Sequence, residues 1–303
     1  MKWILKAFAQ RAFSVFPFAE ELNYFFQKRI LKNLPVSEDL FFAKIDQAIV
    51  HINAWRTWKR DADISGVSFF EFGAGWDLIL PFAFYAMGVR NQTIIDHSTH
   101  IRFDLINNTI TRLAQFKKEL EARQNAHITI PRMTLDKTTE MEHLFGIRYI
   151  APMDASSTGF DDAAFDMITS TDTLEHIPED QLSGIFQECH RILKPGGIFS
   201  CIVDTQDHYS YFDRTISIYN YLKFSDRMWR WFNSRINFQN RLRASEYLHV
   251  AKRAGFKIIE SVFDHGNEVE REILQSLKIA PRFKSFPLDE VGARHVHLVL
   301  QKT

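Results

Sequence analysis

"FFEFGAGWDLILPFAFYAMG", residues 69–88, joins a short apolar run to a longer apolar stretch through two closely spaced glycines. The acidic Glu71 stands near the end of the first run, and Gly73 and Gly75 follow it. Glycine lacks a Cβ and tolerates positive φ, so a ligand can pass close to the main chain there. The pattern predicts a buried strand over 68–72, a tight turn, and a helix near 76–87 that Gly88 ends.

Short apolar runs and amphipathic stretches alternate along the rest of the chain. Further helices are predicted near 100–121 and 179–193, and "KPGG" at Lys194–Gly197 is predicted to stop the second of these. Later strands are predicted at Thr93–Asp96, Arg148–Ala151, Phe165–Ser170, Ile198–Val203, Phe256–Phe263 and His295–Gln301. This alternation predicts an α/β fold whose mostly parallel sheet is covered by helices on both faces.

Residues 1–62 precede this alternation and are predicted to form a helical N-terminal extension. A basic, aromatic helical stretch over 1–34 is interrupted at Pro17. Ser37 is predicted to cap a second helix, in which apolar residues recur every three or four positions: Phe41, Ile45, Ala48, Ile52 and Trp55. We expect residues 63–303 to form one domain with an insertion at about 205–247.

Composition limits the functional classes. The formal net charge is zero, so no global field steers the chain towards nucleic acid. Cys189 and Cys201 lie in apolar segments without a disulfide framework, and the histidines are too scattered to predict a metal site. The chain shows neither a signal-peptide pattern nor an apolar run long enough to span a bilayer, which predicts a cytoplasmic protein.

Two kinds of ligand compete for the glycine turn. A dinucleotide fingerprint needs a small residue at the sixth position, where this chain has Leu78, which disfavours a nicotinamide dehydrogenase. An acidic residue two positions before the first glycine fits the alternative. At Glu71 to Gly75 the sequence resembles the class I S-adenosylmethionine-dependent methyltransferases, although Asp77 stands where that family most often has glycine.

Further motifs extend the resemblance over about residues 67–203, with a continuation towards 303. "TIIDHS" places Asp96 at the end of the second strand, and "RYIAPMDAS" places Asp154 just past the third. "FDMITSTDTLEHIPED" and "RILKPGGIFS" look like the fourth strand and the turn into the fifth. The run Glu175–Pro178 is similar to the corresponding motif in the branch of this methyltransferase family that acts on small molecules and lipids.

The resemblance implies a Rossmann-like, doubly wound sheet of seven strands with one antiparallel strand, and S-adenosylmethionine as cofactor. By that match Asp96 holds the ribose, Asp154 the adenine, and the glycine turn the methionine end. The full set of expected cofactor contacts is Glu71, Gly73, Ala74, Gly75, Asp96, His97, Asp154, Ala155, Ser170, Thr171 and Asp172.

Methyl transfer mainly requires in-line alignment, and a base helps where the acceptor is a hydroxyl. His208 and His176 are the candidate bases, since both follow strands that end at the cofactor edge. Residues 221–243 are rich in arginine and aromatic side chains, which suits an anionic acceptor. Predicted acceptor contacts are Tyr209, Arg227, Arg230 and Trp231, with arginines that merely face water as the alternative.

The sequence therefore predicts methyl transfer to a small-molecule, glycan or lipid-linked acceptor, most simply at a hydroxyl. A nucleic-acid methyltransferase and a catalytically idle cofactor-binding scaffold are the alternatives. No Asn-Pro-Pro-Tyr-like run follows the fourth strand, so we expect no nucleic-acid partner. The basic, aromatic residues 1–34 either contact an anionic membrane peripherally or pack against the catalytic domain.

Overall fold

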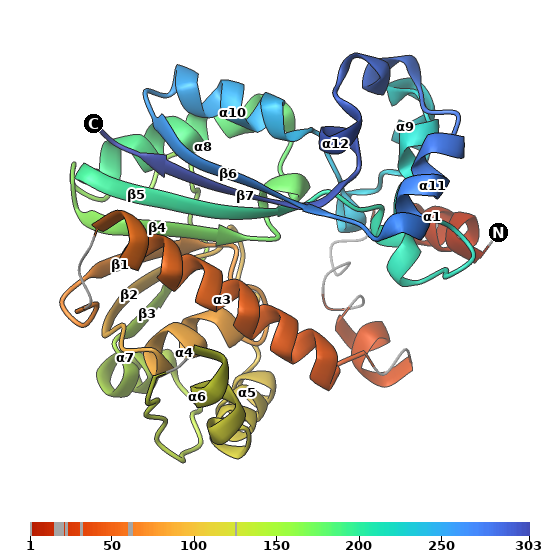
Figure 1. The fold of residues 1–303 in the computed structure, drawn as a ribbon. Helices are drawn as coiled ribbons and strands as arrows, with labels where there is room; N and C mark the ends of the chain where they lie inside the picture. Colours follow the sequence, from red (N-terminus) through yellow and green to blue (C-terminus); the bar gives the residue numbers. More distant parts are fainter. Residues whose placement is uncertain (1, 15–20, 22–23, 31–32, 60–62, 125) are drawn as a thin grey trace.

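The computed structural model describes the chain except for residues 1, 15–20, 22–23, 31–32, 60–62 and 125. Seven strands form one sheet in the order β3-β2-β1-β4-β5-β7-β6 (Figure 1). Pairing is parallel except where β7 meets β5 and β6, so β7 is the antiparallel strand that the resemblance implied. The strands are β1 (Ser68–Phe72), β2 (Asn91–Ile95), β3 (Ile147–Ile150), β4 (Phe165–Thr171), β5 (Leu193–Asp204), β6 (Lys257–His265) and β7 (Ala293–Gln301).

Helices cover both faces of the sheet, as the alternating pattern predicted (Figure 1). Phe69 packs with the core on one face and Phe70 with the core on the other, because successive strand residues point in opposite directions. One face carries α3 (Glu38–Lys59), α4 (Ile79–Ala86), α5 (Phe103–Gln115), α6 (Lys117–Gln124) and α7 (Thr138–Phe145). The other face carries α8 (Glu179–Ile192) and α10 (Ala244–Arg253).

Helix α3 begins where the sequence predicted. The Ser37 hydroxyl accepts a hydrogen bond from the Leu40 main-chain N–H at 3.3 Å. The five apolar residues predicted to share one face of this helix are all buried: Phe41, Ile45, Ala48, Ile52 and Trp55. His51 lies on the same helix and fixes it to the sheet, through Ser200 on β5 at 2.7 Å and Thr171 on β4 at 2.9 Å. Burial lowers the pKa of His51 well below its usual value, so the ring is neutral.

A cap lies beyond one end of the sheet (right in Figure 1). Its apolar core includes Trp3, Trp229 and Phe283, which come from segments far apart in the sequence. The Trp3 main-chain N–H also donates to Asp213 at 3.0 Å. The cap helices are α1 (Lys2–Phe13), α9 (Asp226–Phe232), α11 (Glu268–Ser276) and α12 (Leu288–Val291). Short helical turns complete the described structure at Phe26–Ile30, Leu174–His176, His208–Tyr211, Asn220–Lys223, Arg235–Asn237 and Pro281–Ser285.

Two local predictions need correction. The helix predicted over 100–121 is divided into α5 and α6 at Phe116. "KPGG" does follow the end of α8, but it belongs to β5, whose pairing with β4 shifts between Phe165 and Met167. Pro17 lies outside the described residues. Within the described chain, no helix combines the length and hydropathy needed to cross a bilayer.

Candidate active site

The candidate site lies at the carboxyl edge of the sheet, where the strand order reverses. β1 has β2 on one side and β4 on the other, so the connections from β1 and β4 leave in opposite directions. Such a reversal opens a crevice beyond the strand ends in doubly wound sheets. The segments that follow β1, β2, β3, β4 and β5 carry the predicted cofactor residues and both candidate bases.

The two glycines of the turn have different physical roles. Both have positive φ, 82° at Gly73 and 74° at Gly75. A Cβ at Gly73 would lie 2.4 Å from the Thr173 side chain, whose hydroxyl donates to the Gly73 carbonyl at 3.2 Å. A Cβ at Gly75 would meet no atom within 4 Å. The space at Gly73 is therefore used by a neighbouring loop, and the open side of the turn is at Gly75.

Glu71 is a buried carboxyl that the described chain leaves incompletely satisfied. It is 3% exposed, and its Oε2 has no hydrogen-bond partner among the described residues. Burial raises the pKa of Glu71 to about 8, and repulsion by Asp96 adds to this, while Lys44 opposes it. A buried acceptor beside an open glycine turn fits the ammonium group at the methionine end of the cofactor.

Asp96 follows β2 and is also buried. Its Oδ2 accepts the Tyr149 hydroxyl at 3.0 Å. Burial raises the pKa of Asp96 to about 7, although the Tyr149 hydrogen bond lowers it. Because Tyr149 occupies one oxygen, the other keeps its capacity to accept a further hydrogen bond, as the predicted ribose contact requires. His97, the next residue, is exposed.

Asp154 lies past β3 in an exposed turn. Its Oδ1 accepts from both the main-chain N–H and the hydroxyl of Ser156, each at 2.8 Å. The predicted adenine contact would therefore have to use Oδ2, because Oδ1 is engaged within the turn. Ala155 beside it is half-buried.

Helix α3 contributes residues to this edge that we did not predict from the sequence. Gln47 donates to Asp172 Oδ2 at 2.9 Å, and Lys44 lies 3.3 Å from Asp77 Oδ1. Asp172 has φ of 49°, and its Oδ1 has no partner among the described residues. Burial, then repulsion by Asp204, raises the pKa of Asp172. The spacing of Lys44, Gln47 and His51 along one helix face was the available sequence signal.

Ser170 and Thr171 at the end of β4 have less room for a ligand than the resemblance implied. Ser170 is fully buried, and its hydroxyl has no partner within the described chain. The Thr171 hydroxyl is already bonded to His51 at 2.9 Å. Direct side-chain contact is thus more readily made by Asp172 than by these two residues.

The two candidate bases lie next to each other. The ring centroids of His176 and His208 are 4.9 Å apart, although 31 residues separate them in the chain. His208 Nε2 lies 3.1 Å from Asp204 Oδ2, and His176 Nδ1 lies 2.7 Å from the Phe238 carbonyl. Each ring therefore has one nitrogen engaged and one available.

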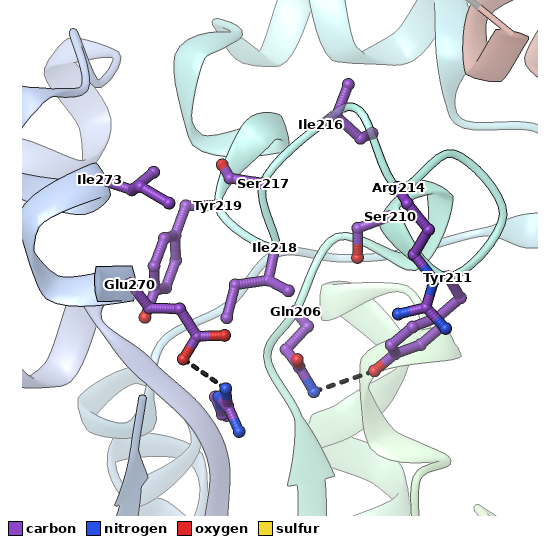
Figure 2. A pocket seen from close by; sticks show the side chains of 11 residues that line it. Gln206, Ser210, Tyr211, Arg214, Ile216, Ser217, Ile218, Tyr219, Glu270 and Ile273 are labelled. Carbon is purple, nitrogen blue, oxygen red and sulfur yellow. Dashed lines mark hydrogen bonds and ion pairs between the residues drawn. The ribbon is translucent and has the colours of Figure 1, made fainter. Parts of the chain in front are cut away.

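A cavity of about 380 Å³ lies between β5 and the cap. Figure 2 shows Glu270, Ile273 and Tyr219 on one side of it and Tyr211 and Arg214 on the other. Gln206 donates to the Tyr211 hydroxyl at 3.0 Å within its wall. The Tyr211 hydroxyl in turn donates to Asp204, which also contacts His208, so Tyr211 stands between the cavity and His208.

The four predicted acceptor residues lie outside the lining of this cavity. Tyr209 is fully buried, and its hydroxyl donates to the Phe232 carbonyl at 2.6 Å. Arg227 and Arg230 are exposed, and Trp231 is 61% exposed on the outside of α9. The aromatic and basic pattern reflects the packing and surface of the cap. The sequence analysis did not identify the lining residues Gln206, Tyr211 and Arg294, because they belong to no periodic pattern.

Comparison with known proteins adds a family match. A model described as "Methyltransferase domain" matches residues 114–201, from the end of α5 into β5. Two curated sequences, both named demethylmenaquinone methyltransferase and both from Staphylococcus epidermidis, are 35% identical over 83 residues. This stretch is 27% of the chain and 32% of each relative, so the chain spans about a third of the length of the curated relatives it matches.

Solved structures of methyltransferases are similar at low identity. Geranyl diphosphate C-methyltransferase from Streptomyces coelicolor A3(2) is 14% identical, with 89% of this chain and 86% of that chain covered and a TM-score of 0.46. An S-adenosylmethionine-dependent methyltransferase from Methanosarcina mazei is 14% identical, with coverages of 80% and 93% and a TM-score of 0.43. At these scores neither similarity carries an argument about this chain.

The matched segment includes β3 at one edge of the sheet, β4 and part of β5 in its middle, and α8 between them in the chain. The residues at the crevice also fit the cofactor that the resemblance implied, since Glu71 offers an unpaired buried oxygen beside the open turn at Gly75. Residues 114–201 are thus similar to a methyltransferase domain, and the seven-stranded sheet with one antiparallel strand has the architecture that the resemblance implied.

Proposed function

We propose that this chain transfers a methyl group from S-adenosylmethionine to a hydroxyl of a small-molecule, glycan or lipid-linked acceptor. The observation that supports the proposal is the His176–His208 pair beyond the ends of β4 and β5, together with the 380 Å³ cavity, whose lining residue Tyr211 stacks on His208. A cavity of this size is typical of small-molecule sites.

In this proposal the cofactor supplies an activated methyl group, and the chain positions it. Glu71 accepts from the ammonium group, Asp96 Oδ1 from the ribose and Asp154 Oδ2 from the adenine amino group. The turn at Ala74 and Gly75 allows the methionine end to approach the main chain. Asp172 borders the reacting end. Holding the reactants in line accounts for roughly 7–11 kcal/mol of barrier lowering in well-oriented reactions.

The acceptor would lie in the cavity, with its hydroxyl at the histidine pair. Asp204 contacts His208 through Nε2 and so fixes the position of the ring. The cap, formed largely by the insertion at about 205–247, would shape the acceptor pocket and exclude water. Arg214 lines the cavity and would meet an anionic acceptor, whereas Arg294 is paired with Glu270 in the cavity wall. In this scheme residues 1–62 are an extension of the catalytic domain at 63–303.

The proposal is tested by titrating S-adenosylhomocysteine into the purified chain in a calorimeter. NAD is titrated in parallel. Cell extracts are then incubated with isotopically labelled S-adenosylmethionine, and labelled products are identified by mass spectrometry. Binding of S-adenosylhomocysteine together with a labelled small molecule would support methyl transfer. Cofactor binding without any labelled product would favour the idle scaffold, and labelled RNA or DNA would favour the nucleic-acid alternative.

We further propose a cytoplasmic protein that contacts an anionic membrane peripherally. Leu5 and Phe8 on α1 are 73% and 49% exposed, and Trp231 on α9 is 61% exposed. Arg11 stacks on the Trp231 ring at 5.5 Å, so α1 and α9 present these groups from adjoining surfaces. Exposed apolar groups beside arginines suit the interface of an anionic bilayer.

Deletion of residues 1–34 would not test membrane contact cleanly, because Trp3 belongs to the core of the cap. The triple variant Leu5→Ser, Phe8→Ser, Trp231→Ser changes only exposed side chains. We expect it to float with phosphatidylglycerol vesicles less than the unaltered chain does. Equal flotation of both, or none by either, would remove the membrane proposal.

A further inference from the structure

Glu175, His176 and His208 meet beyond the ends of β4 and β5. One carboxylate oxygen or ring nitrogen from each residue lies within 4.8 Å of those of the other two. We propose that these three side chains bind a divalent first-row transition cation of the Zn²⁺, Co²⁺ or Fe²⁺ type. The sequence predicted no metal site. His176 and His208 are separated by 31 residues, so their proximity cannot be recognised from their spacing in the sequence.

The buried side chain of Glu175 needs a cation or a hydrogen-bond donor to compensate for its burial. The residue is 3% exposed, and neither carboxylate oxygen has a hydrogen-bond partner among the described residues. Its main-chain carbonyl accepts from the Asn240 N–H at 2.8 Å, which fixes its position. Buried carboxylates are generally paired, hydrogen-bonded or bound to metal, since burial without compensation is costly.

The surrounding charges reinforce this requirement. The negative charges of Asp172 and Asp204 act on Glu175, and a cation among the three groups would offset their repulsion. Lys44, whose charge also reaches Asp172, already pairs with Asp77 at 3.3 Å.

Both histidines are hydrogen-bonded in the way that metal ligands are. The Phe238 carbonyl and the Asp204 carboxylate can only accept, so His176 carries its proton on Nδ1 and His208 on Nε2. His176 Nε2 and His208 Nδ1 then have free lone pairs. Ligating histidines almost always donate their other N–H to a carboxylate or carbonyl, which fixes the tautomer and the ring orientation.

Asp204 is itself firmly held. It accepts from the Tyr211 hydroxyl and, at 3.2 Å, from the Gln206 side chain. Asp204 is therefore a positioning residue for His208.

The ligand set selects the class of metal. Two imidazoles and one carboxylate suit Zn²⁺ and Fe²⁺, whereas Mg²⁺ and Ca²⁺ prefer oxygen ligands throughout. Three protein ligands leave at least one coordination position open. If the proposed function holds, the acceptor hydroxyl would take that position, where its pKa would fall and it would lose its proton to water more readily.

The test uses the full chain after treatment with a chelator. Zn²⁺ is titrated by calorimetry and Co²⁺ by visible absorption, with Mg²⁺ as a comparison, all without S-adenosylmethionine. We expect one Zn²⁺ per chain and a Co²⁺ spectrum of low coordination number. Glu175→Gln and His176→Gln should abolish or greatly weaken binding, and Asp204→Asn should weaken it about 10- to 100-fold.

The exposed His143 on α7 provides the matched control, and His143→Gln should bind Zn²⁺ as the unaltered chain does. His176 is exposed, so its variant keeps the test valid even if Glu175→Gln fails to fold. Unchanged Zn²⁺ affinity in both ligand variants would overturn the site, and tighter binding of Mg²⁺ than of Zn²⁺ would overturn the proposed metal class. A parallel titration with S-adenosylhomocysteine separates failure of the cation site from failure of the proposed function.

Discussion

The carboxyl edge of the sheet has two halves that are built in different ways. At the ends of β1 and β2, single residues such as Glu71 and Asp96 are positioned by the strand that carries or directly precedes them. Beyond β4 and β5, Glu175, Asp204 and His208 form one network that also draws on Phe238 and Asn240 in the cap. The cofactor half depends on local turns, whereas the acceptor half depends on long-range packing.

The largest effect is expected at the glycine turn. Gly73→Ala places a methyl group against Thr173 at a positive φ, which should lower the free energy of unfolding by roughly 2–4 kcal/mol. Gly75→Ala suffers only the backbone strain of about 1–2 kcal/mol but should weaken cofactor binding. Urea denaturation and calorimetry separate the two variants. Partial rescue of Gly73→Ala by Thr173→Ala is the control, and equal destabilisation by both glycine variants would contradict their assigned roles.

The next effect distinguishes two carboxylates of the cofactor half. Asp96 is buried, so Asp96→Ala should weaken S-adenosylhomocysteine binding by about 1.5–3 kcal/mol, the usual worth of a charge-assisted hydrogen bond. Asp154 is exposed and already caps a turn, so Asp154→Asn should cost only about 0.5–1 kcal/mol. Dissociation constants from calorimetry test this order. A larger loss of affinity in Asp154→Asn than in Asp96→Ala would indicate that the cofactor is recognised mainly through its adenine.

Cofactor affinity should also depend on pH through Glu71. Since the pKa of Glu71 is raised to about 8, a cationic ligand must displace its proton below that pH. Affinity for S-adenosylhomocysteine should rise from pH 6 to 8, by at most about tenfold per pH unit, and then level off. Glu71→Gln should remove this dependence. A slope that persists in Glu71→Gln would assign the titration to another group.

The smallest effects concern the acceptor half. Arg227→Ala and Arg230→Ala change exposed side chains outside the cavity, so each should alter stability by less than about 0.5 kcal/mol. Their methylation of the extract acceptor should match that of the unaltered chain. Ser217→Trp, which places an indole ring in the cavity, should strongly lower methylation of the extract acceptor. Strong losses in the arginine variants would restore them as acceptor contacts.

The same contrast explains how much the sequence could predict. Strand β1 was placed residue for residue, and Asp96 and Asp154 were correctly placed just past β2 and β3, because each position depends on a strand end and the turn beside it. The Glu175, His176 and His208 cluster and the cavity could not be predicted, since Glu175 and His208 meet only after the chain beyond β5 has folded back. Tyr209 was predicted to contact the acceptor, but its position in the aromatic core follows from packing against Trp3 and Trp229, which lie far away in the sequence.

Helix α3 could be predicted only in part from the sequence. Its apolar face was predicted correctly, whereas Lys44, Gln47 and His51 were not recognised as contacts to the sheet edge. Polar residues on an amphipathic helix usually face water, so only the crossing of α3 over β4 and β5 shows their partners.

The central claim is that the ends of β1, β2 and β3 together hold one adenosyl ligand. The most direct measurement is a crystal structure of the chain with S-adenosylhomocysteine. The account predicts the amino group at Glu71, the ribose at Asp96 and the adenine at Asp154. Density for the ligand elsewhere, or none at saturating concentration, would contradict it.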